Sequence, residues 1–190
     1  MDVSEGMLFV ISSPSGGGKS TVIKELWKRN VGFSYSVSAT TRPPRRREKE
    51  GIDYFFLDEE TFWKKIEENA FVEWAKVHGY YYGTLRSQVD RYLSKGRKVL
   101  LDIDVQGGLS LKKTRPQTVL IFLLPPSMKV LEKRLQERGT DTEEIMSKRL
   151  NIARKELEMA DRYDFHVIND KLEDTVEEIQ AIIQECAGKF

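Results

Sequence analysis

The chain has 190 residues, 39% of them hydrophobic, which is enough to bury a real core in one domain. Its 31 basic and 30 acidic residues leave a net charge of +1, which excludes a global attraction for nucleic acid. A single cysteine, Cys186, excludes an internal disulfide, and apolar runs such as residues 119–124 are too short to cross a bilayer. Asp2 and Glu5 do not fit a secretory leader, so we expect a cytoplasmic protein without nucleic-acid or membrane partners.

The first motif along the chain is a glycine-rich loop between a strand and a helix. Residues 7–11 form an apolar run typical of a buried strand, and the segment from Val22 to Trp27 has an apolar helical face. The order of strand, loop, Lys-Ser and helix is that of a phosphate-binding loop. The residues that we expect to bind a nucleotide polyphosphate are Ser13, Pro14, Ser15, Gly16, Gly17, Gly18, Lys19, Ser20 and Thr21.

Each residue type in this loop suits a polyphosphate. The glycines allow a tight turn with inward N–H groups, and the helix that follows adds unpaired amides and the positive end of its dipole. Lys19 would contact the outer phosphates, and the Ser20 hydroxyl would be a ligand of Mg²⁺. The motif G-x-x-x-x-G-K-[ST] begins with glycine, whereas this chain has Ser13. The alternative, an ordinary turn rich in glycine and serine, does not explain why all the parts occur in order.

A basic segment follows the next expected strand. Residues 33–38 alternate apolar and small polar side chains, which predicts a strand with one wet face. Residues 39–51 break this pattern with two prolines and predict a surface loop. The loop carries the cations Arg42, Arg45, Arg46, Arg47 and Lys49. These cations could form a solvated face or bind a phosphate through arginine, and the residues alone favour neither reading.

The stretch up to residue 84 differs from its flanks. Residues 53–57 predict a strand, Asp58 is a suitable N-cap for a helix, and residues 71–77 predict another strand. The consecutive tyrosines at 80–82 cannot all face a core, so at least one hydroxyl should reach solvent or a ligand. Short strands with one helix over residues 33–84 indicate an inserted α+β subdomain.

The pattern of a parallel sheet then resumes. Residues 86–95 predict a helix, and residues 98–104 predict a buried strand that ends in Asp102 and Asp104. A carboxylate at such a strand end can hold Mg²⁺ or its waters beside a phosphate loop, although it could also simply face water. Residues 118–124 predict a further buried strand.

The C-terminal part is mostly helical. Residues 127–159 have a helical pattern that is broken at Gly139–Thr140 and carry arginines that usually serve as solubilising residues. Residues 165–168 predict a short strand, and residues 172–183 predict a helix with one buried stripe.

In addition, the chain closely resembles the guanylate kinase family from residue 7 to about residue 185. The resemblance is carried, in the family's order and spacing, by SSPSGGGKST, SVSATTRPPRRREKEGIDY, FVEWAKVHGYYYG, VLLDIDVQG, KRLQERGTDTEEIMSKRL and HVIND. It implies an α/β fold with three layers, namely a P-loop kinase core with a parallel sheet, a small α+β GMP-binding insertion and a helical lid. The implied bounds are about 1–37, 85–126 and 160–190 for the core, 38–84 for the insertion and 127–159 for the lid.

The resemblance also assigns roles to individual residues. For the phosphate of GMP it implies Arg42, Arg45, Tyr54 and Tyr82, with Glu48 steadying the arginines. For the guanine it implies Ser38, Glu73, Thr84 and Asp104. For ATP it implies Arg134, Arg138 and Arg149 of the lid and Asn169 near the adenine, and for the Mg²⁺ shell Asp102. The residues expected to act in catalysis are Lys19, Arg42, Arg138 and Arg149.

The implied reaction is ATP + GMP ⇌ ADP + GDP in a monomer or small homo-oligomer, with Mg²⁺ as the metal. Glu73 suits guanine because a carboxylate can accept from both donors of the guanine edge, whereas N1 of adenine is an acceptor. One rival is a non-catalytic module that binds phosphorylated peptides, but such domains have degraded phosphate loops, and here Lys19 and Ser20 are intact. A second rival, a kinase for another nucleoside monophosphate, is disfavoured by Glu73 together with Ser38.

Overall fold

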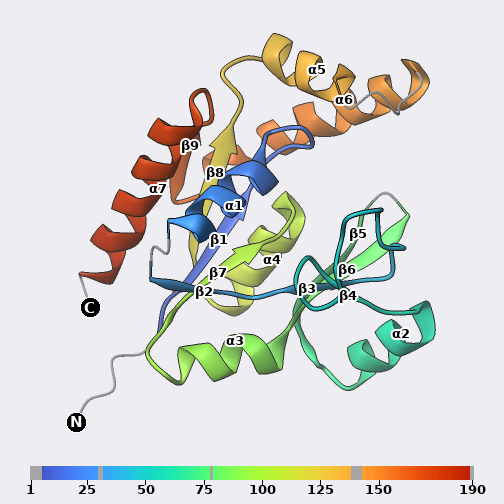
Figure 1. Ribbon diagram of the computed structural model, residues 1–190, viewed down its shortest axis with the longest axis vertical. Helices are drawn as coiled ribbons and strands as arrows, with labels where there is room; N and C mark the ends of the chain where they lie inside the picture. The colour runs from blue at the N-terminus through green and yellow to red at the C-terminus, as the bar shows by residue number, and fades with distance from the viewer. Residues whose placement is uncertain (1–5, 30–31, 78, 138–142, 189–190) are drawn as a thin grey trace.

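A five-stranded parallel sheet forms the centre of the computed structural model, which describes residues 6–29, 32–77, 79–137 and 143–188 (Figure 1). Its strand order is β2-β7-β1-β8-β9. The strands are β1 (Leu8–Ser12), β2 (Phe33–Tyr35), β7 (Lys98–Asp102), β8 (Val119–Leu124) and β9 (Phe165–Ile168). Every residue of β1 is buried, as expected for a central strand that is covered on both faces.

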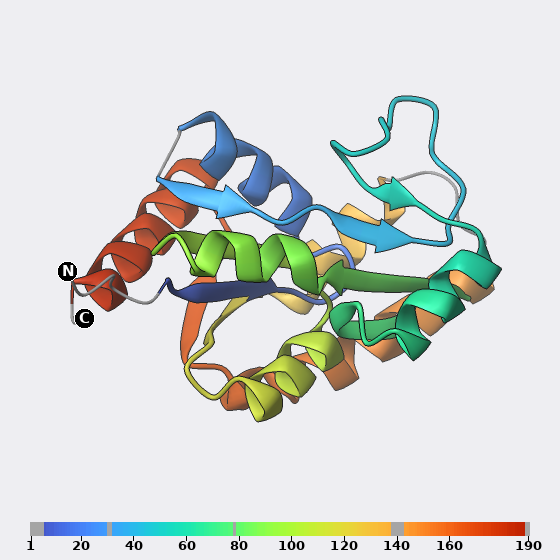
Figure 2. The same cartoon turned by 90° about the horizontal axis from the view of Figure 1, so that it is seen from below.

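Helices cover both faces of this sheet. They are α1 (Lys19–Lys28), α3 (Arg86–Leu93), α4 (Val105–Thr114) and α7 (Leu172–Ala187). Residues of α1 and α7 form one apolar cluster with Phe9 and Ile11, and residues of α3 and α4 form a second cluster with Leu8 and Val10. Figure 2 shows α1 and α7 on one side of the sheet and α4 on the other. Because successive residues of β1 face opposite sides of the sheet, helices pack on both faces, and the core has three layers of helix, sheet and helix.

A smaller sheet lies beside the first, with strand order β4-β3-β6-β5 (Figure 2). Its elements are β3 (Ser38–Thr40), β4 (Phe55–Phe56), α2 (Glu59–Glu67), β5 (Phe71–Val77) and β6 (Tyr80–Leu85). Phe62 of α2 packs on Phe71 and Ala39 in a core of its own. The Asp58 side chain caps α2 by accepting from the Thr61 N–H at 2.6 Å, as its position predicted.

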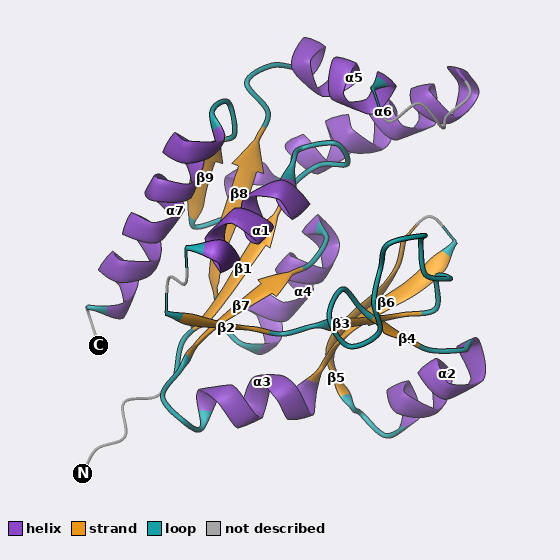
Figure 3. Ribbon diagram, viewed as in Figure 1, coloured by secondary structure: helices purple, strands orange, loops and turns teal. Residues whose placement is uncertain are grey.

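Two helices extend from the carboxyl end of the parallel strands (Figure 3). They are α5 (Met128–Gln136) and α6 (Glu143–Leu157), and the 3₁₀ helix η1 (Ala160–Arg162) follows them. Leu131, Leu135 and Ala153 pack together between α5 and α6. The expected break at Gly139–Thr140 lies outside the described residues. None of the helices in the described part of the chain is long and apolar enough to cross a membrane.

The structure corrects three details of the predicted elements. The expected strand at 33–38 is divided, because Phe33–Tyr35 pairs with β7 whereas Ser38 pairs with Thr84 of the smaller sheet. Ala39 and Thr40, predicted to lie in a loop, belong to β3. The strand expected at 53–57 is reduced to β4, which has two residues.

One helix, α4, was not predicted at all. It contains Gly107 and Gly108, which lower its helix propensity and hide the apolar pattern. A Cβ at Gly108 would lie 2.6 Å from the Tyr163 hydroxyl, so the helix needs glycine to pack this closely. Asp104 caps α4 by accepting from two N–H groups, with Gln106 at 2.9 Å and Gly107 at 3.0 Å. Residue 104 is therefore not part of the preceding strand, which ends at Asp102.

Candidate functional site

The loop from Ser13 to Gly18 joins the carboxyl end of β1 to the start of α1. Gly16 and Gly18 have φ angles of 86° and 90°, a left-handed conformation that residues with a side chain rarely adopt. Gly17 closes a turn by donating its N–H to the Pro14 carbonyl at 2.8 Å. No side chain caps α1, and its first turn has no acidic residue, so the start of the helix favours an anion.

Ser13, the residue that departs from the motif, is buried, and its hydroxyl donates to the Pro14 carbonyl at 3.1 Å. A Cβ added at Gly17 would lie 2.8 Å from the Ser13 Cβ. The loop therefore accommodates serine at its first position because glycine stands opposite at residue 17.

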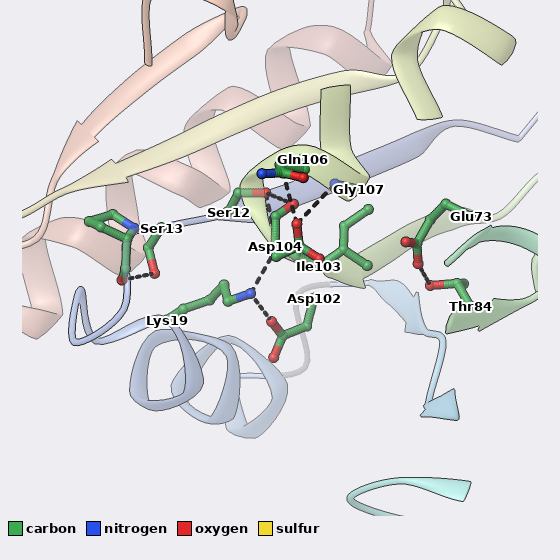
Figure 4. Close-up of polar contacts among 11 residues, drawn as sticks. Ser12, Ser13, Lys19, Glu73, Thr84, Asp102, Ile103, Asp104, Gln106 and Gly107 are labelled. Atoms are coloured by element: carbon green, nitrogen blue, oxygen red, sulfur yellow. Dashed lines mark hydrogen bonds and ion pairs between the residues drawn. The ribbon is translucent and has the colours of Figure 1, made fainter. Parts of the chain in front are cut away.

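Lys19 and Asp102 form an ion pair across the ends of the two central strands (Figure 4). The Lys19 Nζ lies 2.6 Å from Asp102 Oδ1 and donates to the Ile103 carbonyl at 2.8 Å. Asp102 reaches this position because β7 is the parallel neighbour of β1, with Ile11 and Asp102 in register. The predicted proximity of the strand-end carboxylate to the phosphate loop is thus observed.

The donor set near the loop fits Mg²⁺. Ser20 and Asp102 line the same cavity and offer a hydroxyl and a carboxylate oxygen, the hard donors that this ion prefers. Within residues 6–29, 32–77, 79–137 and 143–188, no group of three or more Asp, Glu, His or Cys residues could hold a metal. A sparse set is compatible with Mg²⁺, which usually keeps several waters and is shared with substrate phosphates.

One cavity brings residues from both sheets together. It is lined by the loop from Ser13 to Ser20 and by Ser38, Tyr54, Glu73, Val77, Tyr82, Gly83, Asp102, Ile103, Asp104 and Glu156. The smaller sheet supplies Ser38, Glu73 and Tyr82, whereas the loop and the two aspartates come from the core. Residues that the sequence analysis assigned to GMP and residues that it assigned to ATP therefore line the same cavity.

Glu73 is the most unusual carboxylate of this cavity. It lies on β5, is only 8% exposed, and accepts from the Thr84 hydroxyl of β6 at 2.6 Å (Figure 4). Ser38 is paired with Thr84 across β3 and β6. Burial raises the pKa of Glu73 to about 7; the negative charge of Asp104 acts in the same direction, and the Thr84 hydrogen bond opposes them. A buried acceptor of this kind can bind a ligand edge that carries N–H donors.

For GMP, which the family resemblance implies as a ligand, the raised pKa predicts a pH-dependent affinity. Below about pH 7 the Glu73 carboxyl of the free protein is protonated, and a neutral acid cannot accept from both guanine donors. We expect GMP affinity to fall by up to about tenfold per pH unit below this value. Calorimetric titrations at several pH values would measure the effect. Since the GMP phosphate also titrates, the same series with Glu73→Gln is the control, and identical slopes for both proteins would contradict the prediction.

Gly107 of α4 sets the space available to Glu73. A Cβ at residue 107 would lie 2.8 Å from Glu73 Oε2 and 3.4 Å from Asp104 Oδ2. For the two substrates that the resemblance implies, we expect Gly107→Ala to raise the KM for GMP by at least about tenfold while the KM for ATP stays near its original value, because the methyl group displaces the buried carboxylate. Steady-state kinetics with each nucleotide varied in turn would measure both constants. Ser110→Ala, an exposed site on the same helix, is the matched control; equal increases in both KM values would argue against this role of Gly107.

Arg42 belongs to a compact group at the edge of the cavity. Its Nη2 donates to Glu48 Oε1 and Oε2 at 2.8 and 2.9 Å, and the guanidinium lies 5.4 Å from the ring centre of Tyr54. Tyr54 in turn contacts Tyr82, with ring centres 6.0 Å apart. The backbone N–H of Arg45 donates to Glu48 Oε2 at 2.8 Å, so Glu48 orders both arginine positions. The structure thus brings together all five residues that the sequence analysis linked to a phosphate of the acceptor.

A second cavity shares Gly16 and Gly18 of the loop with the first. It is lined by Gly16, Gly18, Thr21, Arg134, Asn169, Asp170 and Leu172. Asn169 donates from Nδ2 to the Gly17 carbonyl at 2.7 Å, and Arg134 donates from Nη2 to the Asn169 carbonyl at 2.9 Å. Within the described residues, the buried Nη1 of Arg134 finds no hydrogen-bond partner, and it would lie 3.8 Å from a Cβ at Gly18. A buried cationic donor without a partner beside a phosphate loop suits an anion.

The remaining predicted residues are less closely tied to the two cavities. Arg149 lies on α6 and is not among the described residues that line either cavity. Arg138 lies outside the described residues. Conversely, sequence reasoning missed Glu156, which lines the first cavity from α6. Nothing in the charged pattern around it distinguished this glutamate from its exposed neighbours.

Together, the parallel sheet, the glycine loop at the end of β1 and the helix that follows define a P-loop kinase fold. The sequence pattern of the family described as Guanylate kinase matches residues 5–186. The chain therefore belongs to the guanylate kinase family and is a kinase by class.

Individual relatives agree with this assignment. The guanylate kinase of Thermotoga maritima is 49% identical over 185 residues, which are 97% of this chain and 89% of that protein. The guanylate kinase of Clostridium tetani is 50% identical over 181 residues, 95% of this chain and 86% of that protein. The crystal structure of guanylate kinase from Anaplasma phagocytophilum has a TM-score of 0.81 at 34% identity, covering 96% of this chain and 86% of that one. A gluconokinase structure from Sinorhizobium meliloti, with a TM-score of 0.52 at 17% identity and coverage of 98% and 96%, shares the fold alone.

Proposed function

We propose that this chain phosphorylates GMP to GDP with ATP, and that the two substrates meet in the cavity between the phosphate loop and Glu73. One observation carries the proposal: a single cavity is lined by the loop of the core and by a buried carboxylate of the smaller sheet. The loop supplies N–H groups and Lys19 for phosphates, and Glu73 supplies an acceptor for the guanine edge.

The acceptor nucleotide would lie against the smaller sheet. Glu73 would accept from the N1–H and N2–H₂ groups of guanine, with Ser38, Thr84 and Asp104 around the base. The phosphate of GMP would bind Arg42 and Arg45, whose geometry Glu48 maintains, and the hydroxyls of Tyr54 and Tyr82 would add donors. The pKa of Tyr54 is raised to about 12, mainly by burial, so this hydroxyl remains a donor at neutral pH.

The donor nucleotide would span both cavities. Its phosphates would bind the loop from Ser13 to Thr21, with Lys19 moving from Asp102 to the phosphate oxygens. Arg134 has a buried donor here that no other described residue pairs with, and Asn169 would lie beside the adenine. Ser20 and Asp102 would hold Mg²⁺, which supplies charge neutralisation at the transferred phosphoryl group when it is bound.

In the proposed mechanism, an oxygen of the GMP phosphate attacks the γ-phosphorus of ATP in line, and ADP leaves. The nucleophile is already an anion, so no general base is required. The obstacle is the repulsion between two phosphate groups, which Lys19, Arg42, Arg138 and Arg149 would offset. Catalysis would therefore consist of positioning and charge neutralisation.

We further propose that the chain is organised as a core (about 1–37, 85–126 and 160–190), a GMP-binding insertion (38–84) and a lid (127–159). The smaller sheet takes its strands from residues 38–85, and α5 and α6 extend from the end of β8, which supports this division. Movement of the insertion and the lid over the substrates would exclude water, which would otherwise accept the phosphoryl group. We expect a cytoplasmic enzyme that acts as a monomer or small homo-oligomer.

A coupled assay of ADP formation with GMP, AMP, CMP and UMP would test the proposed function. We expect strong turnover with GMP and at most weak turnover with the other three nucleotides. Preference for another monophosphate would refute the assignment of guanine to Glu73. If no nucleotide supports turnover, while a phosphorylated peptide binds, the chain is a recognition module and the kinase proposal fails.

A further inference from the structure

A carboxylate from α6 occupies part of the phosphate loop. Glu156 Oε2 accepts from the backbone N–H of Ser15 at 3.2 Å, although the two residues are 141 positions apart in the sequence. Glu156 also lines the first cavity, together with the loop and Lys19. The proposed reaction gives this side chain no role.

Burial and the neighbouring carboxylate of Asp104 make this position unfavourable for a charged Glu156 side chain. Burial raises the pKa of Glu156, and the charge of Asp104 adds to this effect, whereas the Ser15 N–H and Lys19 oppose it. Among the described residues, the ion pairs do not include Glu156, and the cation facing it, Lys19, is paired with Asp102. The hydrogen bond to the loop is thus the specific polar contact that holds this carboxylate.

The same cavity shows a second contact of this type. Lys19, the cation of the loop, is paired with Asp102 at 2.6 Å. Two groups that suit phosphate, a loop N–H and the lysine ammonium, are therefore each satisfied by a carboxylate of the protein. A bound polyphosphate would replace both carboxylates as the acceptor for these groups, and it would repel a Glu156 carboxylate that stayed at the loop, whereas Asp102 would face Mg²⁺.

We propose that the Glu156 carboxylate competes with the phosphates of the donor nucleotide for the loop and so sets the affinity for ATP and ADP. The inference rests on the proposed function, because it assumes that the donor nucleotide binds at this loop. Binding of the donor displaces Glu156 from the Ser15 N–H and releases the end of α6 from the loop. When ADP leaves, the carboxylate returns to the N–H and assists release of the product.

Glu156→Gln tests this proposal, since glutamine keeps the size of the side chain and an oxygen that accepts from Ser15 but removes the charge. We expect ADP and inorganic tripolyphosphate to bind about three- to tenfold more tightly to this variant, a gain that shrinks as ionic strength rises. Adenosine, which has no phosphate, should bind equally to both proteins. Glu158→Gln, an exposed neighbour near the end of the same helix, is the matched control and should change nothing.

The sign of the change separates competition from a structural role. If Glu156 merely anchors α6 to the loop, Glu156→Ala weakens binding of ADP and tripolyphosphate, whereas competition predicts tighter binding for this variant as well. In steady-state kinetics, competition lowers the KM for ATP and leaves the KM for GMP unchanged. Unchanged or weaker binding of tripolyphosphate to Glu156→Gln overturns the proposal. Failure of the proposed function is distinguishable, because it would appear in the unmodified protein as absence of ADP binding or of GMP phosphorylation.

Discussion

Lys19→Ala is expected to reduce phosphoryl transfer by a factor on the order of 10² or more, because the variant loses a cation that stabilises charge on the transferred group. The fold should persist. The Lys19 side chain is 19% exposed and that of Asp102 is 17% exposed, so water can reach the carboxylate after the substitution. Steady-state rates with saturating ATP and GMP, together with circular dichroism, would measure the two effects separately.

Lys24→Ala provides the control for this experiment. Lys24 lies on the exposed side of α1, five residues after Lys19, and its removal changes the net charge by the same amount. This variant should retain its activity. Near-normal turnover of Lys19→Ala, or an equal loss in both variants, would contradict the catalytic role of Lys19.

Glu73→Gln is expected to weaken GMP binding by about 2 to 4 kcal/mol, since the amide accepts with one oxygen only and turns an NH₂ group toward the donor edge of guanine. Calorimetry with GMP would measure the loss directly. Binding of ADP should be unaffected, because Glu73 lies on the smaller sheet, whereas the loop belongs to the core.

The same variant should be more stable than the original protein at high pH. The pKa of Glu73 is raised in the folded state, so its contribution to stability is present below the unfolded value of 4.5 and is lost as the pH rises through about 7. Thermal unfolding at pH 5 and pH 8 should show a larger gain for Glu73→Gln at pH 8. Glu67→Gln, at the exposed end of α2, is the control.

In the binding experiment, unchanged affinity of Glu73→Gln for GMP would mean that guanine is recognised elsewhere.

Local patterns in the sequence were enough to predict most of the core. The continuous apolar run of β8 and the apolar stripe of α7 have clear periods, and each was predicted as strand or helix near its observed bounds. The patterns failed where tertiary contacts decide the structure. The division of residues 33–38 between two sheets depends on pairing with residues 98–100 and 84. Helix α4 depends on a cap from Asp104 and on close packing against Tyr163.

The candidate site was predictable to a similar extent. The glycine loop with Lys19 is recognisable because its residues are contiguous, and Asp102 because a strand end must lie near that loop in a parallel sheet. The buried position of Glu73 could not be derived from its alternating strand, since alternation does not tell which side faces a ligand. Glu156 gave no signal at all, because its contact with Ser15 joins positions 141 residues apart.

The two sheets carry side chains with different proposed roles, and this separation affects how substrate preference can diverge in this class of enzyme. The side chains suited to reading the base, Glu73 and Thr84, stand on neighbouring strands of the smaller sheet, while Lys19 and Asp102 stand at the ends of strands in the larger one. Gly107, on α4 of the core, packs close to Glu73 and so links the smaller sheet to the core. In the proposed mechanism, substitution of the base-facing residues of β5 and β6, Glu73 and Thr84, would therefore change nucleobase preference and leave Lys19 and Asp102 in place. Directed evolution of new acceptors should begin on those two strands.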